Sequence, residues 1–337
     1  MKKRMVAIDN LKGILTLLVI FGHVTVGLSG LANGAYTQAS FVEKVSTIIY
    51  AFHMPLFFSL SGFFWKEKRN IGIGKRMSII KNKLVALALP YILCSVVYFF
   101  IKYAMGAYTA VDLTLDDLIK IPIYPIEFFW YLYSLLTISI LAELLDALHI
   151  SKKIIIVILA IIAISGFVDT DFMALYKTAE NAVYFYLGSL VYDYKEHFTK
   201  NKCIVLTGGG FLLTLGTYLY LFEADHAILH FLLCACSIGF SIGIAERTLE
   251  REIPYITYIG KYSMPFYVIH VIFVGGIRII LYKLGIQDVM IHLICGFGAT
   301  TVVCYILYRY IISKIKYLDF MFYPMNYIKG MSQNRQK

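Results

Sequence analysis

The sequence predicts an all-α membrane protein, a polytopic bundle of about ten transmembrane helices forming a single domain (1–337) with both termini in the cytoplasm. Three observations lead to this prediction. First, 59% of the residues are hydrophobic and 15% are charged, whereas a soluble protein is nearer one half apolar and one quarter charged. Second, apolar runs long enough to cross a bilayer as helices recur along the whole chain. Third, most lysines and arginines fall in alternate connecting segments, as the positive-inside rule expects of cytoplasmic loops.

The first span starts near the N-terminus and could be mistaken for a signal peptide. Asp9 and Lys12 interrupt the apolar run, and no small-residue cleavage site follows, so we interpret it as a retained helix. The fifth and sixth spans are short. The expected spans are 6–28, 45–65, 84–101, 128–145, 154–168, 181–192, 203–222, 227–245, 264–282 and 289–312.

The connections between the spans have distinct compositions. Residues 66–83 are rich in Lys and Arg and are expected to form a cytoplasmic, interfacial segment before the third span. An external loop over 102–127 contains Pro122 and Pro125, which disfavour a regular helix. The seventh and eighth spans are joined by a tight external turn, "EADH".

Two classes of site are disfavoured by composition. The net charge of +10 is explained by positive-inside loops, so we do not expect nucleic-acid binding. The six cysteines lie in or beside apolar runs without metal-ligand or disulfide spacing, so we expect buried thiols and no metal site.

The first helix carries a stripe of polar groups. Lys12 and His23 are eleven residues apart, which places them on one helix face about 16 Å apart along the axis. Asp9, three residues before Lys12, can neighbour it on that face. Because charged and polar groups are costly in lipid, we expect the stripe to face the bundle interior or a wet cavity. Alternatively, Lys12 snorkels to the inner headgroups and His23 reaches interfacial water.

Two further histidines lie in expected spans. His53 is in the middle of the second span, with Pro55 two residues later and Ser61 in a polar strip that permits close helix approach. His270 lies in the ninth span. A single intramembrane histidine can be a helix–helix contact, but two on consecutive antiparallel helices favour a functional site.

Four motifs resemble those of the integral-membrane acyltransferase-3 family, whose members acylate cell-surface polysaccharides and related carbohydrates. A basic residue, ten residues and a histidine match Lys12 to His23, and "FHMPLFFSLSGFF" resembles the second-helix motif. "FWYLYSLL" and "IGKYSMPFYVIH" resemble the aromatic-leucine motif and the element near the C-terminus. The motifs occur in family order and span most of the chain.

The resemblance implies an acyl-CoA co-substrate, usually acetyl-CoA, reached from the cytoplasm, with no bound cofactor. It implies a sugar hydroxyl of a lipid-linked or growing polysaccharide as acceptor. By position, His23 matches the essential histidine and Lys12 its basic partner, although arginine is commoner there and lysine lacks its bidentate geometry. Lys81 and Lys83 match cationic positions at the start of the third helix.

These residues suggest a mechanism. Imidazole titrates near neutrality, so His23 is the expected base, and His53 would orient it, share its proton or assist the oxyanion. Lys12, Lys81 and Lys83 would draw the CoA phosphates. The expected acceptor site or cavity lining consists of Asp9, Ser61, Trp130, Tyr131 and His270, although interfacial anchoring explains the two aromatic residues equally well.

Two other functions are consistent with the sequence: a transporter or flippase for a small solute or lipid-linked sugar, and a non-catalytic partner of a polysaccharide synthase. The sequence shows no internal repeat, and Pro55 is the one clear helix breaker near the expected site, whereas transporters often show inverted repeats and broken helices. The expected location is the plasma membrane. The Ile, Lys, Tyr and Phe usage is typical of an AT-rich bacterial genome, such as that of a Gram-positive host.

Overall fold

A computed structural model describes residues 5–29, 39–105, 113–166, 168, 170, 172–221 and 226–328. These residues are mostly helical and contain no β-strand, which confirms the predicted all-α class. The chain packs into two compact units: unit 1 comprises Met1–Trp65 and Tyr184–Tyr308, and unit 2 comprises Lys66–Val183 and Arg309–Lys337. Every predicted site residue lies within the described residues, whereas the turn predicted at 223–226 lies largely outside them.

The described residues hold eight helices that are long and apolar enough to cross a membrane. This confirms a polytopic membrane protein, and each of the eight overlaps a predicted span. They are Val6–Leu28, Phe41–Phe63, Ile73–Ala104, Glu127–Ala147, Asn201–Tyr220, Ala227–Thr248, Ser263–Lys283 and Val289–Lys314.

The predicted fifth and sixth spans form helices that do not meet this description. Helix α7 (Lys152–Ser165) has 14 residues, so its rise of about 21 Å is shorter than the hydrocarbon core. Helix α8 (Met173–Asp193) has 21 residues and is longer than predicted. Its first turns contain polar residues, including Lys177, Glu180 and Asn181, so the apolar run in the sequence covers only its second half.

The third predicted span also begins earlier than expected. Helix α3 (Ile73–Lys83) passes through a π-helical turn (Leu84–Ala88) into α4 (Leu89–Met105) without a break. The prediction that the helix starts at Leu84 is therefore wrong. The combined span of 32 residues is about 48 Å long, more than the hydrocarbon core requires.

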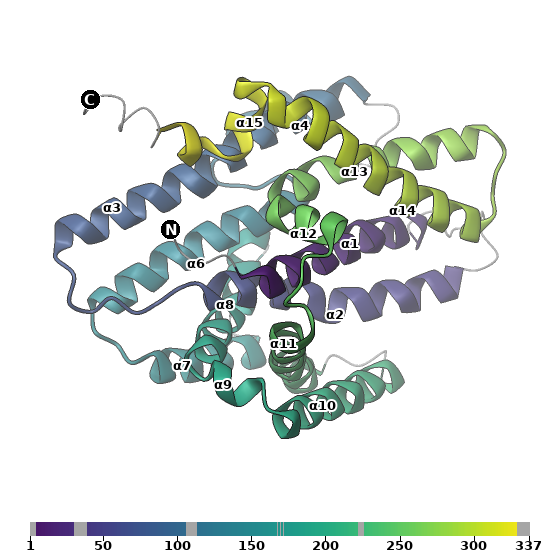
Figure 1. The fold of residues 1–337 in the computed structure, drawn as a ribbon. Helices are drawn as coiled ribbons and strands as arrows, with labels where there is room; N and C mark the ends of the chain where they lie inside the picture. The colour runs from purple at the N-terminus through teal and green to yellow at the C-terminus, as the bar shows by residue number, and fades with distance from the viewer. Residues whose placement is uncertain are drawn as a thin grey trace. The chain divides into compact units, whose positions relative to one another are not determined.

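Unit 1 contains the helices that carry the predicted site histidines, α1, α2 and α13, which are labelled in Figure 1. It includes the C-terminal part of α8, from Tyr184 onward, and a long bundle of helices. The bundle helices are α1 (Val6–Ser29), α2 (Ala39–Phe63), α9 (Lys195–Phe198), α10 (Asn201–Tyr220), α11 (Ala227–Thr248), α12 (Pro254–Lys261), α13 (Ser263–Lys283) and α14 (Val289–Ile306).

Helix α1 packs closely on α12 because glycines lie at their crossing. A side-chain carbon at Gly260 would overlap the backbone oxygen of Asp9, and one at Gly13 would overlap the backbone oxygen of Ile256. Close to this crossing, the fully buried Asn10 donates hydrogen bonds to the backbone oxygens of Leu249 (2.9 Å) and Arg251 (2.8 Å). These contacts fix the N-terminal part of α1 within unit 1.

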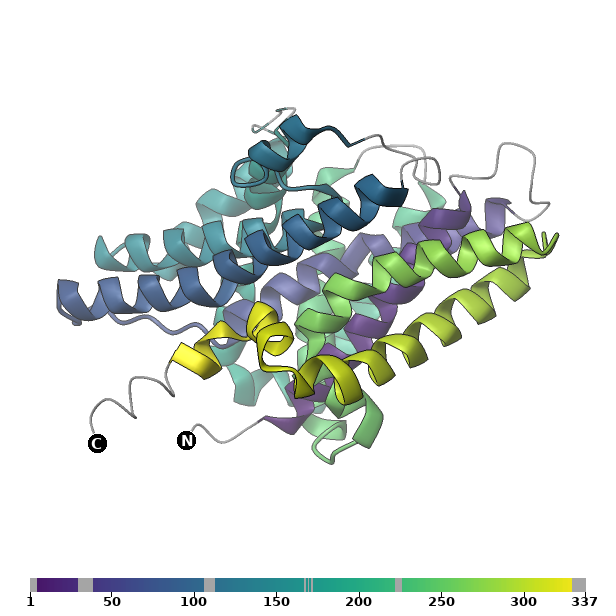
Figure 2. The same ribbon diagram turned by 90° about the horizontal axis from the view of Figure 1, so that it is seen from above.

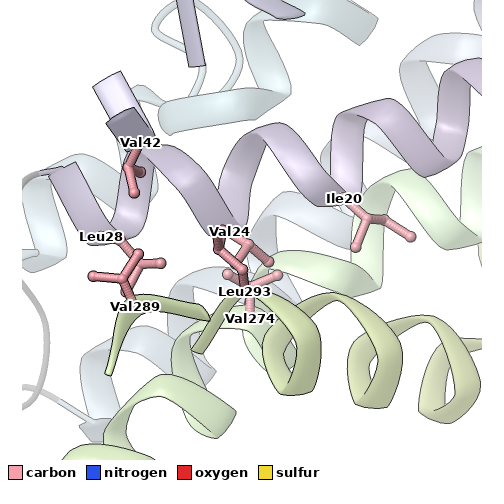
Figure 3. Packing of buried hydrophobic residues seen from close by; sticks show 7 residues of the cluster. All are labelled: Ile20, Val24, Leu28, Val42, Val274, Val289 and Leu293. Atoms are coloured by element: carbon pink, nitrogen blue, oxygen red, sulfur yellow. The ribbon is translucent and has the colours of Figure 1, made fainter. Parts of the chain in front are cut away.

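The other half of α1 packs into a hydrophobic cluster with α2, α13 and α14 (Figure 3). Helices α13 and α14 contact one another and lie side by side in both ribbon views (Figures 1 and 2). Burial of these aliphatic side chains against each other sets how far α1 approaches α13. The cluster consists of Ile20, Val24, Leu28, Val42, Val274, Val289 and Leu293.

Unit 2 contains α3, the π-helical turn, α4, α7 and the first part of α8, together with α5 (Leu115–Lys120), a 3₁₀ turn (Glu127–Phe129), α6 (Trp130–Ala147) and α15 (Lys316–Phe322). Helix α5 begins with a capping box between Thr114 and Asp117. Hydrogen bonds from the Thr114 backbone N–H and then its hydroxyl lower the pKa of Asp117, so this cap is lost only when the pH falls below that lowered pKa. The sequence analysis expected no regular helix in this loop, so α5 corrects that expectation; the helix ends at Lys120, shortly before Pro122.

Candidate active site

Three helices of unit 1 bring the predicted histidines into its interior. His23 on α1 is half-buried, whereas His53 on α2 is 2% exposed and His270 on α13 is fully buried. The His23 and His270 rings are in contact, with centroids 4.9 Å apart. His270, which the sequence placed in an acceptor or cavity lining, is therefore the direct neighbour of His23.

The ring of Tyr50 on α2 lies between those of His23 and His53 and contacts both. Its centroid lies 6.2 Å from that of His23 and 4.8 Å from that of His53, in both cases edge to face. The sequence analysis did not identify this residue. The signal was present, because Tyr50 and His53 are three residues apart and share a helix face, but the contact with His23 depends on helix packing.

Gly22 on α1 allows Tyr50 to approach. A side-chain carbon there would lie 3.1 Å from the Tyr50 ring and 3.2 Å from the Ile49 side chain. Both distances are shorter than ordinary van der Waals separations between carbons. A larger residue at position 22 would therefore push α2, with its tyrosine, away from His23.

Backbone hydrogen bonds fix the tautomers of two histidines. Nδ1 of His53 lies 2.7 Å from the Ile49 carbonyl oxygen, and Nδ1 of His270 lies 3.0 Å from that of Phe266. A carbonyl oxygen only accepts, so Nδ1 carries the hydrogen in each neutral ring. Nε2 then holds the lone pair in both residues, and each can receive a proton there.

The cationic end of the α1 stripe lies at the other end of α2. Nζ of the half-buried Lys12 lies 4.8 Å from the centroid of the Phe64 ring, a cation–π distance. Asp9 is also half-buried, and its backbone oxygen contacts Gly260. Lys12 and His23 thus both face α2, about three helical turns apart, as their spacing predicts.

Ser61 is half-buried, and its hydroxyl donates to the Phe57 carbonyl oxygen one turn earlier (3.2 Å). This bond lies within its own helix. The expected close approach in the polar strip is made by Gly62: a side-chain carbon there would overlap the backbone oxygen of Phe185 on α8.

In unit 2, a buried ion cluster surrounds the fully buried Glu143 on α6. Lys68 Nζ lies 3.2 Å from Glu143 Oε1, and Arg76 donates to the Glu143 carbonyl oxygen (2.7 Å) and to Asp146 Oδ2 (2.9 Å). Lys83 Nζ lies 3.8 Å from Glu143 Oε1. In these contacts three basic side chains meet two carboxylates. The sequence analysis identified Lys83 but not its partners, which are distant along the chain.

The remaining predicted residues also lie in unit 2. Lys81 is exposed. Trp130 is half-buried, with Lys177 Nζ 5.8 Å from its ring centroid, and Tyr131 is buried and meets Trp130 edge to face at 6.4 Å. Across the described residues, no group of three His, Cys, Asp or Glu side chains is arranged to hold a metal ion.

The helices and the imidazole cluster together define a multi-pass membrane protein with titratable groups held in its interior. A family model described as an acyltransferase domain matches residues 5–309. The chain therefore belongs to the acyltransferase family 3 and is a membrane acyltransferase. Searches of curated proteins and of solved structures found no match.

Proposed function

We propose that the protein is an O-acyltransferase of the plasma membrane that moves an acetyl group from acetyl-CoA to a hydroxyl of a cell-surface polysaccharide or its lipid-linked precursor. The observation that carries the proposal is the contact of His23, in unit 1, with both the fully buried His270 and Tyr50, which is 37% exposed. In a chain of this family, such a cluster supplies the proton-transfer groups that acyl transfer to an alcohol requires.

In the proposed reaction, His23 removes the proton from the acceptor hydroxyl. The hydroxyl oxygen forms a bond to the thioester carbonyl carbon, and the carbonyl oxygen becomes an oxyanion. The oxyanion then reforms the carbonyl as the carbon–sulfur bond breaks. The departing sulfur takes the proton from the His23 imidazolium, which returns the base to its neutral form and yields the ester and free CoA.

His53, Tyr50 and His270 have different proposed roles in proton sharing, oxyanion stabilisation and orientation of the base. The lone pair at Nε2 of His53 suits it to share a proton, but neutral His53 has no hydrogen there to donate to an oxyanion. The Tyr50 hydroxyl can donate such a hydrogen bond. His270, fully buried against His23, would hold the orientation of the His23 ring.

We assign Lys12 a role in binding the phosphates of the acyl-CoA substrate. Its ammonium group is partly desolvated over Phe64, and a cation in such a place attracts phosphate strongly. The arm of CoA separates its phosphates from its thioester, so a cation and a base about 16 Å apart on one helix face suit the two ends of this substrate. That Lys81 and Lys83 attract the CoA phosphates stays a separate prediction.

The first test uses purified protein, labelled acetyl-CoA and a carbohydrate acceptor, with label measured on the carbohydrate. Loss of a general base lowers rates by about 10²- to 10⁴-fold, so His23→Ala should fall by that factor. The matched control is His197→Ala, because His197 is exposed on α9. Near-normal transfer by the His23 variant would remove its assignment as base.

The same assay tests Lys12. Lys12→Ala should raise the KM for acetyl-CoA, whereas Lys12→Arg keeps the charge and should keep part of the activity. An equal loss of acylation activity in Lys12→Ala and Lys12→Arg would show that the positive charge alone does not explain the role of Lys12. If the wild-type protein transfers no label but moves an intact lipid-linked sugar across vesicles, the transporter alternative replaces the enzyme proposal.

A further inference from the structure

Pro55 leaves one backbone acceptor of α2 without its helical donor. In an α-helix the carbonyl oxygen of residue i accepts from the N–H of residue i+4, and proline has no N–H. Pro55 lies inside α2, so the carbonyl oxygen of Ala51 loses its ordinary partner. A backbone oxygen left unsatisfied inside a membrane protein is costly, and another group is expected to supply the donor.

Helix α11 supplies that donor. Nε2 of His230 lies 2.9 Å from the Ala51 oxygen, and Sγ of Cys234, one turn further along α11, lies 3.3 Å from the same atom. Because the acceptor is a carbonyl, His230 must carry its hydrogen on Nε2. This tautomer is opposite to that of His53 and His270, whose Nδ1 atoms donate.

The bond acts on the turn of α2 that carries two rings of the candidate active site. Ala51 directly follows Tyr50 and precedes His53 by two residues. Movement of this turn relative to α11 would therefore change how Tyr50 and His53 are presented to His23. The proline thus exchanges a bond within α2 for a bond to a neighbouring helix, and the neighbour fixes the turn.

We propose that His230 is a positioning residue for acyl transfer, which holds the Tyr50–His53 turn of α2 in register through the carbonyl that Pro55 releases. The inference rests on the proposed function and deepens it. His230 touches neither His23 nor His53 in any contact described above, so its effect on the reaction passes through the backbone of α2.

The test is a double-mutant cycle between positions 230 and 55, with acylation kinetics and melting temperature as independent readouts. His230→Leu should lower kcat roughly tenfold, because small misplacements of catalytic groups are costly, with little change in the KM for acetyl-CoA. His230→Gln keeps a donor near the Nε2 position and should restore most of kcat. In the Pro55→Ala background, the restored N–H satisfies the Ala51 oxygen, so His230→Leu should cost much less in both readouts.

Three results would overturn the inference: unchanged kcat and melting temperature in His230→Leu, no rescue by glutamine, or equal effects of His230→Leu in the proline and alanine backgrounds. If Pro55→Ala does not fold, the glutamine and leucine variants still decide it, with Cys236→Ala on the same helix as the control. Absence of acyl transfer by wild-type protein would contradict the proposed function alone, since the melting-temperature cycle still measures the coupling between His230 and Pro55.

Discussion

Backbone carbonyls determine what three histidines of unit 1, His53, His230 and His270, can do. His53 and His270 both donate from Nδ1 to the carbonyl one turn earlier on their own helix. Nε2 of each ring is therefore a proton acceptor. His230 donates from Nε2 to another helix. Residues of one chemical type are thus divided, by their hydrogen-bond partners, into groups that can take a proton and a group that holds structure.

This division predicts the behaviour of a conservative change at position 53. Asparagine can still donate to the Ile49 oxygen from roughly the place of Nδ1, but it has no equivalent of the Nε2 lone pair. His53→Asn should therefore keep the wild-type melting temperature and lose about 10²-fold or more in acylation rate. Acylation within twofold of wild type would show that His53 only orients its neighbours.

At the scale of helices, glycines set the closest approaches in unit 1. Gly13 and Gly260 allow α1 and α12 to touch through their backbones, and Gly62 does the same for α2 and α8. Small residues at such crossings are typical of membrane helices, because close backbone approach supplies the packing energy that apolar burial cannot supply in lipid.

Different changes in melting temperature are expected for two glycine-to-alanine variants. At Gly260 the new carbon would overlap the Asp9 backbone oxygen, and overpacking typically costs about 1–3 kcal/mol, so Gly260→Ala should lower the melting temperature. At Gly216, in α10, nothing lies within 4 Å of the new carbon. Alanine favours a helix over glycine, so Gly216→Ala should leave the melting temperature unchanged or slightly raised. Equal shifts in the two variants would contradict the close α1–α12 contact.

Elements with continuous apolar runs could be predicted from the sequence, and elements stabilised by distant partners could not. Helix α1 begins and ends near its predicted limits, whereas α2 begins six residues before its predicted start. Helix α3 was missed because its charges suggest a surface segment, whereas Arg76 is buried by pairing with Asp146, 70 residues away. Tyr50 and His230 were missed as site residues because their roles depend on contacts between helices, which no local pattern contains.

On the scale of the whole molecule, the dominant property is positive charge. The chain carries a net charge of +10, and much of it is expected in the cytoplasmic segments. In unit 2 the contacts around Glu143 contain more basic than acidic side chains, and Lys81 is exposed. A polyanionic donor such as acyl-CoA would be attracted to such a surface before it reaches any specific site.

This attraction predicts that the affinity for the donor depends on salt. Raising the ionic strength from about 0.1 M to about 1 M shortens the screening length from about 10 Å to about 3 Å. The KM for acetyl-CoA should therefore rise several-fold, whereas kcat, which the proposal assigns to groups of unit 1, should change little. Sucrose of equal osmolarity is the control. A constant KM across this range would contradict electrostatic attraction of the donor.

The hydrogen bonds of Asn10 have a consequence for biosynthesis. Its partners, Leu249 and Arg251, are 239 and 241 residues further along the chain. At a synthesis rate of roughly 5 to 20 residues per second, the ribosome needs on the order of 10 to 50 seconds to reach them. During that time the amide of Asn10 must be hydrated or shielded by the insertion machinery, so nascent chains released before residue 249 should be preferred targets of membrane quality control.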